Sequence, residues 1–528
     1  MRSRKGRHRN VWPALSAVLS LTVSGPGSAQ SSAPTAAVEA CKALESADFS
    51  GVLDAPTQLT EAKVVPASGV VPAYCLAKGF VATHVGIELR LPIENWNGKF
   101  MEVGCGGHCG LFFTALCSGP LKKGYACIAS DMGHTSLTTQ AAWAYNNLQA
   151  QIDWGYRAAH VTALAGKAIT AAYYSHAPSR SYFLGCSTGG REGMVESQRF
   201  PWDFDGIAVG APVVDSSGWP VELLWAIRAL TGPDGNSILS VADTQRLHEA
   251  AVAQCDMDDG VKDGIIGDPL ACKFDPAKLL CKTGGGPGCF SAAQIEAIDK
   301  VYKGIPPELV SRTYTQGAVP GSELNWVDSF LTFWSTRQYV ADMFRYEGFW
   351  PAPGPGWNIA DFDFNRDPRR VGMFAALANA NNPDLRKFAA NGNKMILYFG
   401  WHDLLQKEAI DYYETVERLM GGRAATQKFL RLFAVPGMNH CSGGPGAFAI
   451  DYLSYLEAWV EQGQAPDEMV GAHVDGLSWS QAFGLTLPLD KSLPVSFSRP
   501  VYPYPIRARY KGRGDPNDAR NFKPVGSP

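Results

Sequence analysis

The sequence predicts an α/β fold, in which a mostly parallel sheet is covered by helices on both faces and one long insertion interrupts the core. Apolar strand-like runs alternate with helix-like stretches in both halves of the chain. This alternation stops after Pro212 and resumes at Lys394. Parallel strands need long crossover connections, usually helices, so the alternation indicates a sheet that is buried on both faces.

The first half of the chain supplies several strands and one long helix. Residues 86–92 alternate apolar and polar side chains, as a half-buried strand does. Residues 99–103 and 125–129 are short apolar runs typical of buried strands. An alanine-rich stretch with helical spacing, residues 156–174, leads into another apolar run at 182–184.

The second half repeats the pattern with an apolar run at 394–399, a helix-like stretch at 408–420 and a further apolar run at 428–435. We therefore predict one core domain that is split by an inserted domain, because 528 residues exceed one ordinary domain. The expected boundaries are residues 30–213 and 382–528 for the core and 214–381 for the insertion.

The insertion is rich in aromatic side chains. Between residues 326 and 364, 12 of 39 residues are Phe, Trp or Tyr, against 11% of the whole chain. We expect most of them to fill a small core of the insertion's own. The other interpretation is that some line a flat apolar pocket for an aromatic substrate.

The composition indicates a globular protein without a nucleic-acid partner. Charged residues make up 18% of the chain and hydrophobic residues 46%, and the formal net charge is −3. Five of the basic side chains lie in the first 29 residues, so the remainder is more acidic still. No basic surface for a nucleic acid is expected, and nothing in the composition indicates an oligomeric state.

The first 29 residues resemble a secretory signal peptide. A basic start precedes an apolar stretch, residues 11–23, that is too short to span a bilayer, and small residues at 27–29 are typical of a cleavage site. The alternative is a basic disordered tail. No later run is long and apolar enough for a membrane helix, so we expect a secreted or periplasmic protein with no membrane partner.

The string Gly185-Cys186-Ser187-Thr188-Gly189 predicts a nucleophile elbow. It follows an apolar run and precedes a helix-like stretch, and strand, sharp turn and helix are the context that this motif needs. Glycines permit the tight turn and the close passage of the helix. We expect Ser187 to be a nucleophile; the alternative is an ordinary turn.

A serine hydroxyl needs a histidine to accept its proton and a carboxylate to orient that histidine. Asp403 and His440 each follow directly after an expected strand. Asp411 is a weaker candidate because it falls inside a helix, and His402 and His473 are weaker because of their positions. The order serine, acid, histidine is that of an α/β-hydrolase.

Two further features depend on this triad. Cys186 precedes the serine and Cys441 follows the histidine, so a Ser187–His440 hydrogen bond would place the two cysteines within disulfide reach. The oxyanion hole is expected to use the backbone N–H of Thr188 and a second N–H from the glycine-rich loop at 103–107, with Gly104 as our choice.

An acidic loop at residues 256–265 lies between Cys255 and Cys272. Clustered carboxylates repel one another unless a hard cation lies among them, although the spacing is not that of an EF-hand. From spacing alone, a calcium site and a solvated acidic turn are both possible. The twelve cysteines of an exported protein are expected to pair, and disulfides are favoured over a metal site at Cys105 and Cys109.

Together, the Cys186-Ser187, Asp403 and His440-Cys441 motifs resemble the tannase and feruloyl esterase family. The likeness runs from about Cys41 to about Ala519. It includes short matching segments at residues 96–100, 130–134, 203–207, 361–364, 502–505 and 509–512.

This resemblance implies an α/β-hydrolase core and a lid domain with a structural Ca²⁺ ion. The implied ligands are the side chains of Asp256, Asp259 and Asp263 and the carbonyls of Val261 and Ile265. The resemblance also implies the disulfides Cys41–Cys75, Cys255–Cys272 and Cys281–Cys289. It leaves the pairing of Cys105, Cys109, Cys117 and Cys127 open.

The chain departs from the family's pattern in two places. Cys105 stands where the glycine-rich loop usually has a polar residue, and a further cysteine pair of some members near the C-terminus is missing. A family member that hydrolyses mono(2-hydroxyethyl) terephthalate holds the substrate carboxylate with a lid arginine. Arg337 lies in a comparable place and is our candidate for a substrate contact.

The sequence thus predicts a secreted serine esterase that cleaves small esters of aromatic acids, such as feruloyl, other hydroxycinnamoyl or galloyl esters. Ser187 would attack the ester carbonyl, with His440 as base and Asp403 as its orienting acid. The first alternative is a terephthalate-monoester hydrolase. A peptidase or a non-catalytic binding protein on the same scaffold is less favoured, because all three triad candidates are present.

Overall fold

The computed structural model describes residues 35–282, 288–309, 317–327, 333–404, 406–476 and 493–526. The expected signal peptide, residues 1–29, lies outside these ranges. Within them, no helix has both the length and the apolar character that crossing a membrane requires.

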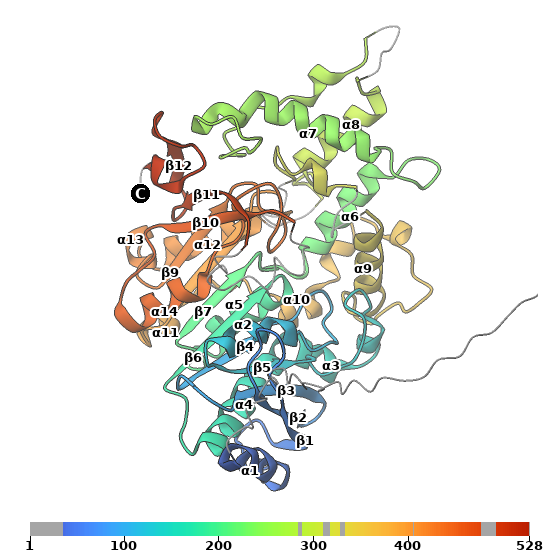
Figure 1. Ribbon diagram of the computed structural model, residues 1–528. Coiled ribbons are helices and arrows are strands. Elements are labelled where there is room, and N and C mark those ends of the chain that lie inside the picture. Colours follow the sequence, from blue (N-terminus) through green and yellow to red (C-terminus); the bar gives the residue numbers. More distant parts are fainter. Residues whose placement is uncertain are drawn as a thin grey trace, which may run out of the picture.

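A nine-stranded sheet forms the centre of the molecule, in the order β1-β2-β3-β5-β4-β6-β7-β8-β9 (Figure 1). The first four strands in this order pair antiparallel, and all pairs from β5 to β9 are parallel. The strands are β1 (Thr57–Val65), β2 (Tyr74–Val81), β3 (Val85–Pro92), β4 (Lys99–Val103), β5 (Ala126–Ser130), β6 (Arg180–Cys186), β7 (Gly206–Gly210), β8 (Lys394–Gly400) and β9 (Leu430–Val435).

Helices cover both faces of this sheet. Successive strand residues point to opposite faces, so each face carries apolar side chains that are buried against other elements. On β6, Phe183 belongs to one buried apolar cluster, whereas Tyr182 and Leu184 belong to a second. The first cluster includes residues of α1 (Thr35–Ala43), α4 (Ala158–Tyr174), α5 (Thr188–Arg199), α11 (Arg386–Ala390) and α12 (Gln406–Leu419). The second includes residues of α14 (Tyr452–Gln462) and the two-stranded sheet of β10 (Met469–Val474) and β11 (Val495–Val501).

Smaller elements complete the core. They are the short helices α2 (Ser118–Lys122), α3 (Leu148–Ile152) and α13 (Arg423–Thr426), and a C-terminal hairpin of β12 (Arg507–Tyr510) and β13 (Phe522–Val525).

The segment between β7 and β8 contains the predicted insertion. Its helices are α6 (Trp219–Leu230), α7 (Val241–Cys255), α8 (Ala292–Lys303), α9 (Phe333–Tyr346) and α10 (Gly372–Ala378). Figure 1 shows this green-to-yellow segment gathered beside the core. Its aromatic side chains pack on one another, with Phe344 and Phe362 ring centroids 4.8 Å apart. They share one contiguous buried cluster with the helices on the sheet, and do not form a separate core.

All twelve cysteines are paired. The structure contains the four disulfides that the sequence and the family resemblance imply, and it pairs the four remaining cysteines within the first half of the core. The bonds are Cys41–Cys75, Cys105–Cys109, Cys117–Cys127, Cys186–Cys441, Cys255–Cys272 and Cys281–Cys289.

The turn after β6 passes very close to the loop after β4. A Cβ atom built on Gly104 would lie 2.5 Å from the Cα of Gly189, and one built on Gly185 would lie 2.3 Å from the carbonyl oxygen of Gly189. The N–H of Gly189 also donates to the carbonyl of Cys105 at 2.9 Å. Gly104 and Gly189 therefore allow backbone-to-backbone contact between two neighbouring strand exits, and Gly185 allows the tight turn of the elbow itself.

We predict that Gly104→Ala destabilises the protein by ~1–3 kcal/mol, because the added methyl group overlaps backbone that cannot move aside. Urea unfolding followed by circular dichroism measures the change. Gly372→Ala is the matched control, since a Cβ there meets no atom within 4 Å. Equal stability of the two variants would contradict this account of the close approach.

Candidate active site

Ser187 occupies a strained turn between β6 and α5. Its backbone angles are φ 61° and ψ −123°, outside the regions that non-glycine residues normally adopt. The N–H of Ser187 donates to the carbonyl of Gly210 at 2.9 Å, which holds the turn against the end of β7. The residue is only partly buried, so a substrate can reach it. Strain at one partly exposed serine after a strand is typical of a nucleophile elbow.

Asp403 and His440 meet at the ends of β8 and β9. The Oδ2 atom of Asp403 lies 2.7 Å from Nδ1 of His440, and both side chains are buried. Asp403 also accepts the N–H of Leu404 at 2.6 Å, which fixes the carboxylate. A hydrogen bond at Nδ1 makes Nε2 the nitrogen that can take a proton from a hydroxyl.

A disulfide connects the serine loop to the histidine loop. Cys186 and Cys441 are bonded, with their Cα atoms 5.8 Å apart. Because this bond joins cysteines that are 255 residues apart in the sequence, it also holds their neighbours, Ser187 and His440, near each other. The structure thus brings the three predicted triad positions to one edge of the sheet, at the carboxyl ends of β6, β8 and β9.

The acid and histidine loops are also joined by hydrogen bonds. The N–H of His402 donates to the carbonyl of Met438 at 3.0 Å. Asn325, a buried residue of the insertion, donates from Nδ2 to the carbonyl of His402 at 2.7 Å and to Oδ1 of Asn439 at 3.1 Å. Sequence reasoning missed Asn325, because a lone asparagine in an irregular segment carries no motif.

His402, the competing histidine, has a different environment. Its side chain is buried, and burial together with the neighbouring His248 lowers its pKa to about 4. It is therefore neutral at ordinary pH. His473 bonds to the carbonyl of Gly446 from Nδ1 at 2.8 Å and lies 3.3 Å from Asp475.

Gly104 is not available as an oxyanion donor, which corrects the sequence-based expectation. Its N–H donates to the carbonyl of Leu184 at 2.9 Å and so continues the pairing of β4 with β6. The same loop contacts the elbow again three residues later, where the hydroxyl of Thr188 donates to the carbonyl of Gly107 at 2.6 Å. Across the described chain, the N–H groups of Gly106 and Gly107 donate to no backbone carbonyl.

The predicted calcium loop is folded on itself and held by the Cys255–Cys272 bond. Asp256 accepts the N–H groups of Asp263 and Gly264, and Asp259 accepts the N–H of Val261 at 2.9 Å. Burial raises the pKa of Asp259 to about 6 and also raises that of Asp263. Asp259 and Asp263 are thus partly desolvated carboxylates of like charge, and carboxylate oxygens are the ligands that a hard cation such as Ca²⁺ prefers.

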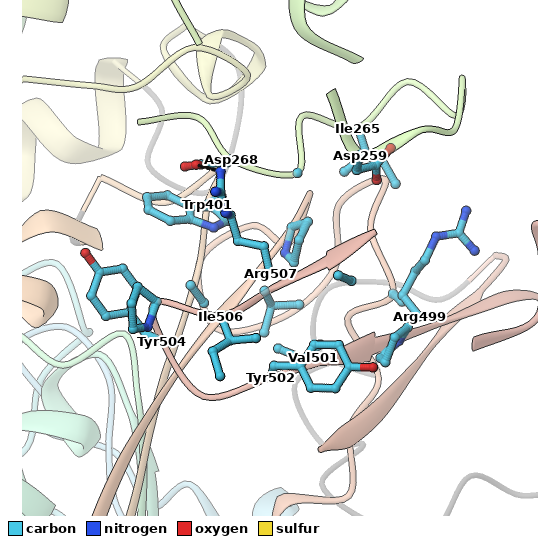
Figure 2. A pocket seen from close by; sticks show the side chains of 18 of the residues that line it. Asp259, Ile265, Asp268, Trp401, Arg499, Val501, Tyr502, Tyr504, Ile506 and Arg507 are labelled. Atoms are coloured by element: carbon cyan, nitrogen blue, oxygen red, sulfur yellow. Dashed lines mark hydrogen bonds and ion pairs between the residues drawn. The ribbon is translucent and has the colours of Figure 1, made fainter. Parts of the chain in front are cut away.

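Arg499 of β11 supplies one positive charge to this loop, since its Nη2 atom lies 2.6 Å from Oδ2 of Asp263. Figure 2 shows Asp259 and Ile265 together at the rim of a cavity of about 380 Å³. Trp401, Tyr502 and Tyr504 also line this cavity. None of the three triad residues does, so the cavity and the triad are separate features.

Arg337 lies on α9 and is partly buried. The same helix contacts the loop after β4, because the ring of Tyr339 stacks on that of His108 with centroids 4.1 Å apart. The helix that carries Arg337 is therefore anchored near the elbow.

Comparison with known proteins agrees with this geometry. Residues 70–525 match the family model described as tannase and feruloyl esterase. The chain belongs to the tannase and feruloyl esterase family. An uncharacterized esterase of Xanthomonas campestris is 32% identical, covering 92% of this chain and 90% of that protein. Mono(2-hydroxyethyl) terephthalate hydrolase of Piscinibacter sakaiensis is 33% identical, covering 93% and 92%.

The fold of this tannase and feruloyl esterase family member is also that of a solved relative. The crystal structure of feruloyl esterase B from Aspergillus oryzae matches with a TM-score of 0.79 and 26% identity. The match covers 93% of this chain and all of that one. The α/β-hydrolase core expected from the order of the triad motifs is therefore confirmed.

We predict that replacing Cys186 and Cys441 together by serine lowers the free energy of unfolding by ~5 kcal/mol, because the bond closes a very long loop in the unfolded chain. The matched control replaces Cys281 and Cys289, whose loop is short, and should cost ~2.5 kcal/mol. Urea titration of both double variants gives the comparison. A smaller loss for the long-loop bond would disprove this view of the tether.

Proposed function

We propose that the protein is an exported serine carboxylic ester hydrolase that cleaves small esters of aromatic acids through an acyl-enzyme. The observation that carries this proposal is the Asp403–His440 hydrogen bond at 2.7 Å, which a disulfide ties to the strained serine turn. The family relationship supports the same reaction class.

The residues act in the following roles. Ser187 Oγ attacks the ester carbonyl carbon while His440 Nε2 accepts the hydroxyl proton. The tetrahedral intermediate collapses, the carbon–oxygen bond to the alcohol breaks, and His440 returns the proton to the departing alcohol. A water molecule then attacks the acyl-serine by the same route, which releases the aromatic acid and restores Ser187.

The negative oxygen of each tetrahedral intermediate needs N–H donors. Thr188 is the first residue of α5, where backbone N–H groups have no partner within the helix. We assign the second donor to the Gly106-Gly107 stretch, because the Thr188 hydroxyl holds the carbonyl of Gly107 beside the elbow.

The substrate class follows from the family, and a second candidate follows from one relative. Relatives named feruloyl esterase support hydroxycinnamoyl or galloyl esters as substrates. The relative named mono(2-hydroxyethyl) terephthalate hydrolase supports a terephthalate monoester as the alternative. In that case Arg337 would pair with the free carboxylate of the substrate, as Arg–carboxylate pairs commonly do.

We predict that Ser187→Ala removes hydrolysis of methyl ferulate, methyl gallate and mono(2-hydroxyethyl) terephthalate, since no other group can form the acyl-enzyme. Asp403→Asn should lower kcat by about 10⁴, because the wrong tautomer of His440 then faces the serine. Chromatography of the released products gives the rates. The Arg337→Gln variant, assayed on all three esters, distinguishes the two candidate substrate classes. A selective loss on the terephthalate ester would favour the alternative, and turnover by Ser187→Ala would refute the serine mechanism.

We also propose that the loop at 256–265 holds a structural Ca²⁺ ion. Asp256, Asp259 and Asp263 would supply carboxylate oxygens, and Val261 and Ile265 would supply carbonyl oxygens. The ion would neutralise carboxylates whose burial otherwise favours their protonated form. It would stabilise the inserted segment, which we propose to be a lid domain over residues 214–381, and would take no part in the reaction.

Removal of divalent ions with a chelator is expected to lower the Tm, and added Ca²⁺ is expected to restore it. An ion present at one hundred times its Kd stabilises the folded state by ~2.7 kcal/mol. Asp259→Asn should lose this response, whereas Asp258→Asn, at an exposed neighbouring position, should keep it. A Tm that does not respond to chelator would leave only a solvated acidic turn.

Export is the third part of the proposal. The six disulfides are typical of a protein in an oxidising compartment, and the basic and apolar start of the chain is typical of a signal peptide. Both observations favour a secreted or periplasmic enzyme.

A further inference from the structure

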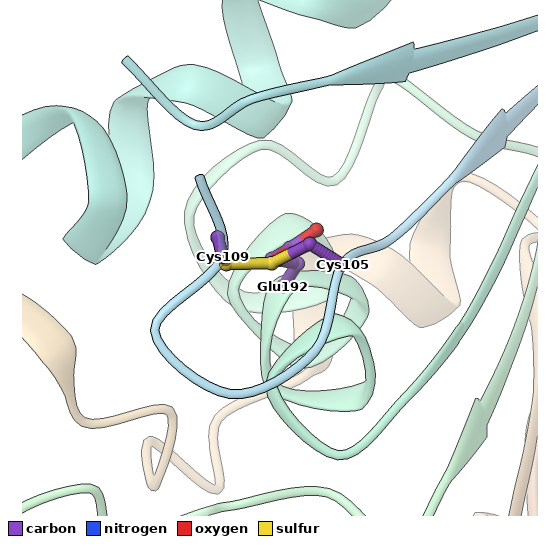
Figure 3. Close-up of side chains that lie close together, drawn as sticks. All are labelled: Cys105, Cys109 and Glu192. Carbon is purple, nitrogen blue, oxygen red and sulfur yellow. A yellow bond between two sulfur atoms is a disulfide. The ribbon is translucent and has the colours of Figure 1, made fainter. Parts of the chain in front are cut away.

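The Cys105–Cys109 disulfide closes a five-residue ring within the loop after β4. The ring encloses Gly106, Gly107 and His108, and so includes both N–H groups that could complete the oxyanion hole. Figure 3 shows the bond lying against the side chain of Glu192, which comes from the elbow helix α5. This bond is the part of the site that sequence reasoning left unassigned.

One side of the ring is fixed to the elbow. The carbonyl of Cys105 accepts the N–H of Gly189 at 2.9 Å, and the carbonyl of Gly107 accepts the hydroxyl of Thr188 at 2.6 Å. The two donors, Gly189 and Thr188, directly follow Ser187. The contact between Gly104 and Gly189 brings this turn close to the ring. Any shift of the ring therefore changes where its N–H groups lie relative to the nucleophile.

The opposite side of the ring is fixed to the insertion. His108 is completely buried; its Nδ1 atom lies 3.0 Å from Oε1 of Glu347, and its ring stacks on Tyr339. The N–H of His108 donates to the carbonyl of Thr138 at 2.8 Å. The ring thus lies between the nucleophile and the segment expected to cover the substrate.

The backbone of the ring has conformations that an unconstrained loop would not keep. Gly107 has φ 60°, and Cys109, which is not a glycine, has φ 63°. Glycines are conformationally free and a left-handed cysteine is unfavourable, so an open loop of this sequence would sample many other shapes. Closing the loop covalently removes most of those shapes.

The side chain of Glu192 also contacts the ring. It is buried, its Oε1 atom lies 2.9 Å from Sγ of Cys105, and its carboxylate accepts the backbone N–H of Cys105. The N–H of Cys105 is therefore already hydrogen-bonded to Glu192. The N–H of Gly104 is likewise already hydrogen-bonded to the carbonyl of Leu184. The donors that remain in this loop before His108 are those of Gly106 and Gly107.

We propose that the Cys105–Cys109 disulfide is a positioning element for catalysis, which holds the Gly106-Gly107 N–H groups at the oxyanion site. The inference rests on the proposed esterase function. Its consequence is that loss of this bond slows the chemical step without weakening substrate binding, because the donors act on charge that develops only in the transition state.

The test compares two double variants of the full chain, Cys105→Ser/Cys109→Ser and the control Cys117→Ser/Cys127→Ser. The control removes another short-range disulfide of the same half of the core. On methyl ferulate, or whichever ester the wild type turns over, the first variant should lose at least tenfold in kcat with KM changed less than twofold. The control should keep kcat within twofold of wild type.

A second readout separates positioning from general destabilisation. A phenylboronic acid forms a serine adduct with an oxygen at the oxyanion site, so its affinity should fall in the first variant by a factor similar to that in kcat. Unchanged kcat and boronate affinity in the first variant, or equal losses in the control, would overturn the proposal. If Ser187→Ala remains active, the proposed function itself fails, and the positioning role fails with it.

If the first variant does not fold, thiol trapping on the wild-type enzyme provides the test. Alkylation after denaturation, with peptide mapping, should find Cys105 and Cys109 bonded to each other in fully active enzyme. Free thiols at these two positions in fully active enzyme would overturn the proposal.

Discussion

The covalent tie between Cys186 and Cys441 is the constraint on which the rest of the site depends. Parallel strands bring their carboxyl ends to one edge, but the loops that follow are free to diverge. The tie joins the first and last of the three loops, and the Asp403–His440 hydrogen bond joins the last to the middle one. A strained serine can then persist because its surroundings over-determine its conformation.

The contacts between backbones reinforce this tie. Gly104 and Gly189 let two strand exits touch without side chains between them. Gly400 does the same between β8 and the loop after β9, where a Cβ would lie 2.1 Å from the carbonyl oxygen of Met438. Small residues are therefore concentrated where catalytic loops must approach one another, and larger residues are kept for the core below.

Much of this arrangement was predictable because its signals are local. The elbow motif, the strand-end positions of Asp403 and His440, and the cysteines beside the catalytic residues can each be read from a few neighbouring residues. The antiparallel strands β1 and β2 were missed although they pair with each other as neighbours in the sequence, because their apolar pattern is weak. Gly104 was misassigned because a sequence cannot show which N–H groups a neighbouring strand already uses.

The side chain of Asn325 limits how the insertion can change. Its amide spans the acid and histidine loops from a segment of more than a hundred residues that is otherwise remote from them in sequence. Asn325 is thus one of several points that join the insertion to the core, beside the contacts of His108 with Glu347 and Tyr339. The insertion can therefore change at other positions without losing this link, whereas loss of the Asn325 amide removes a hydrogen bond from both loops.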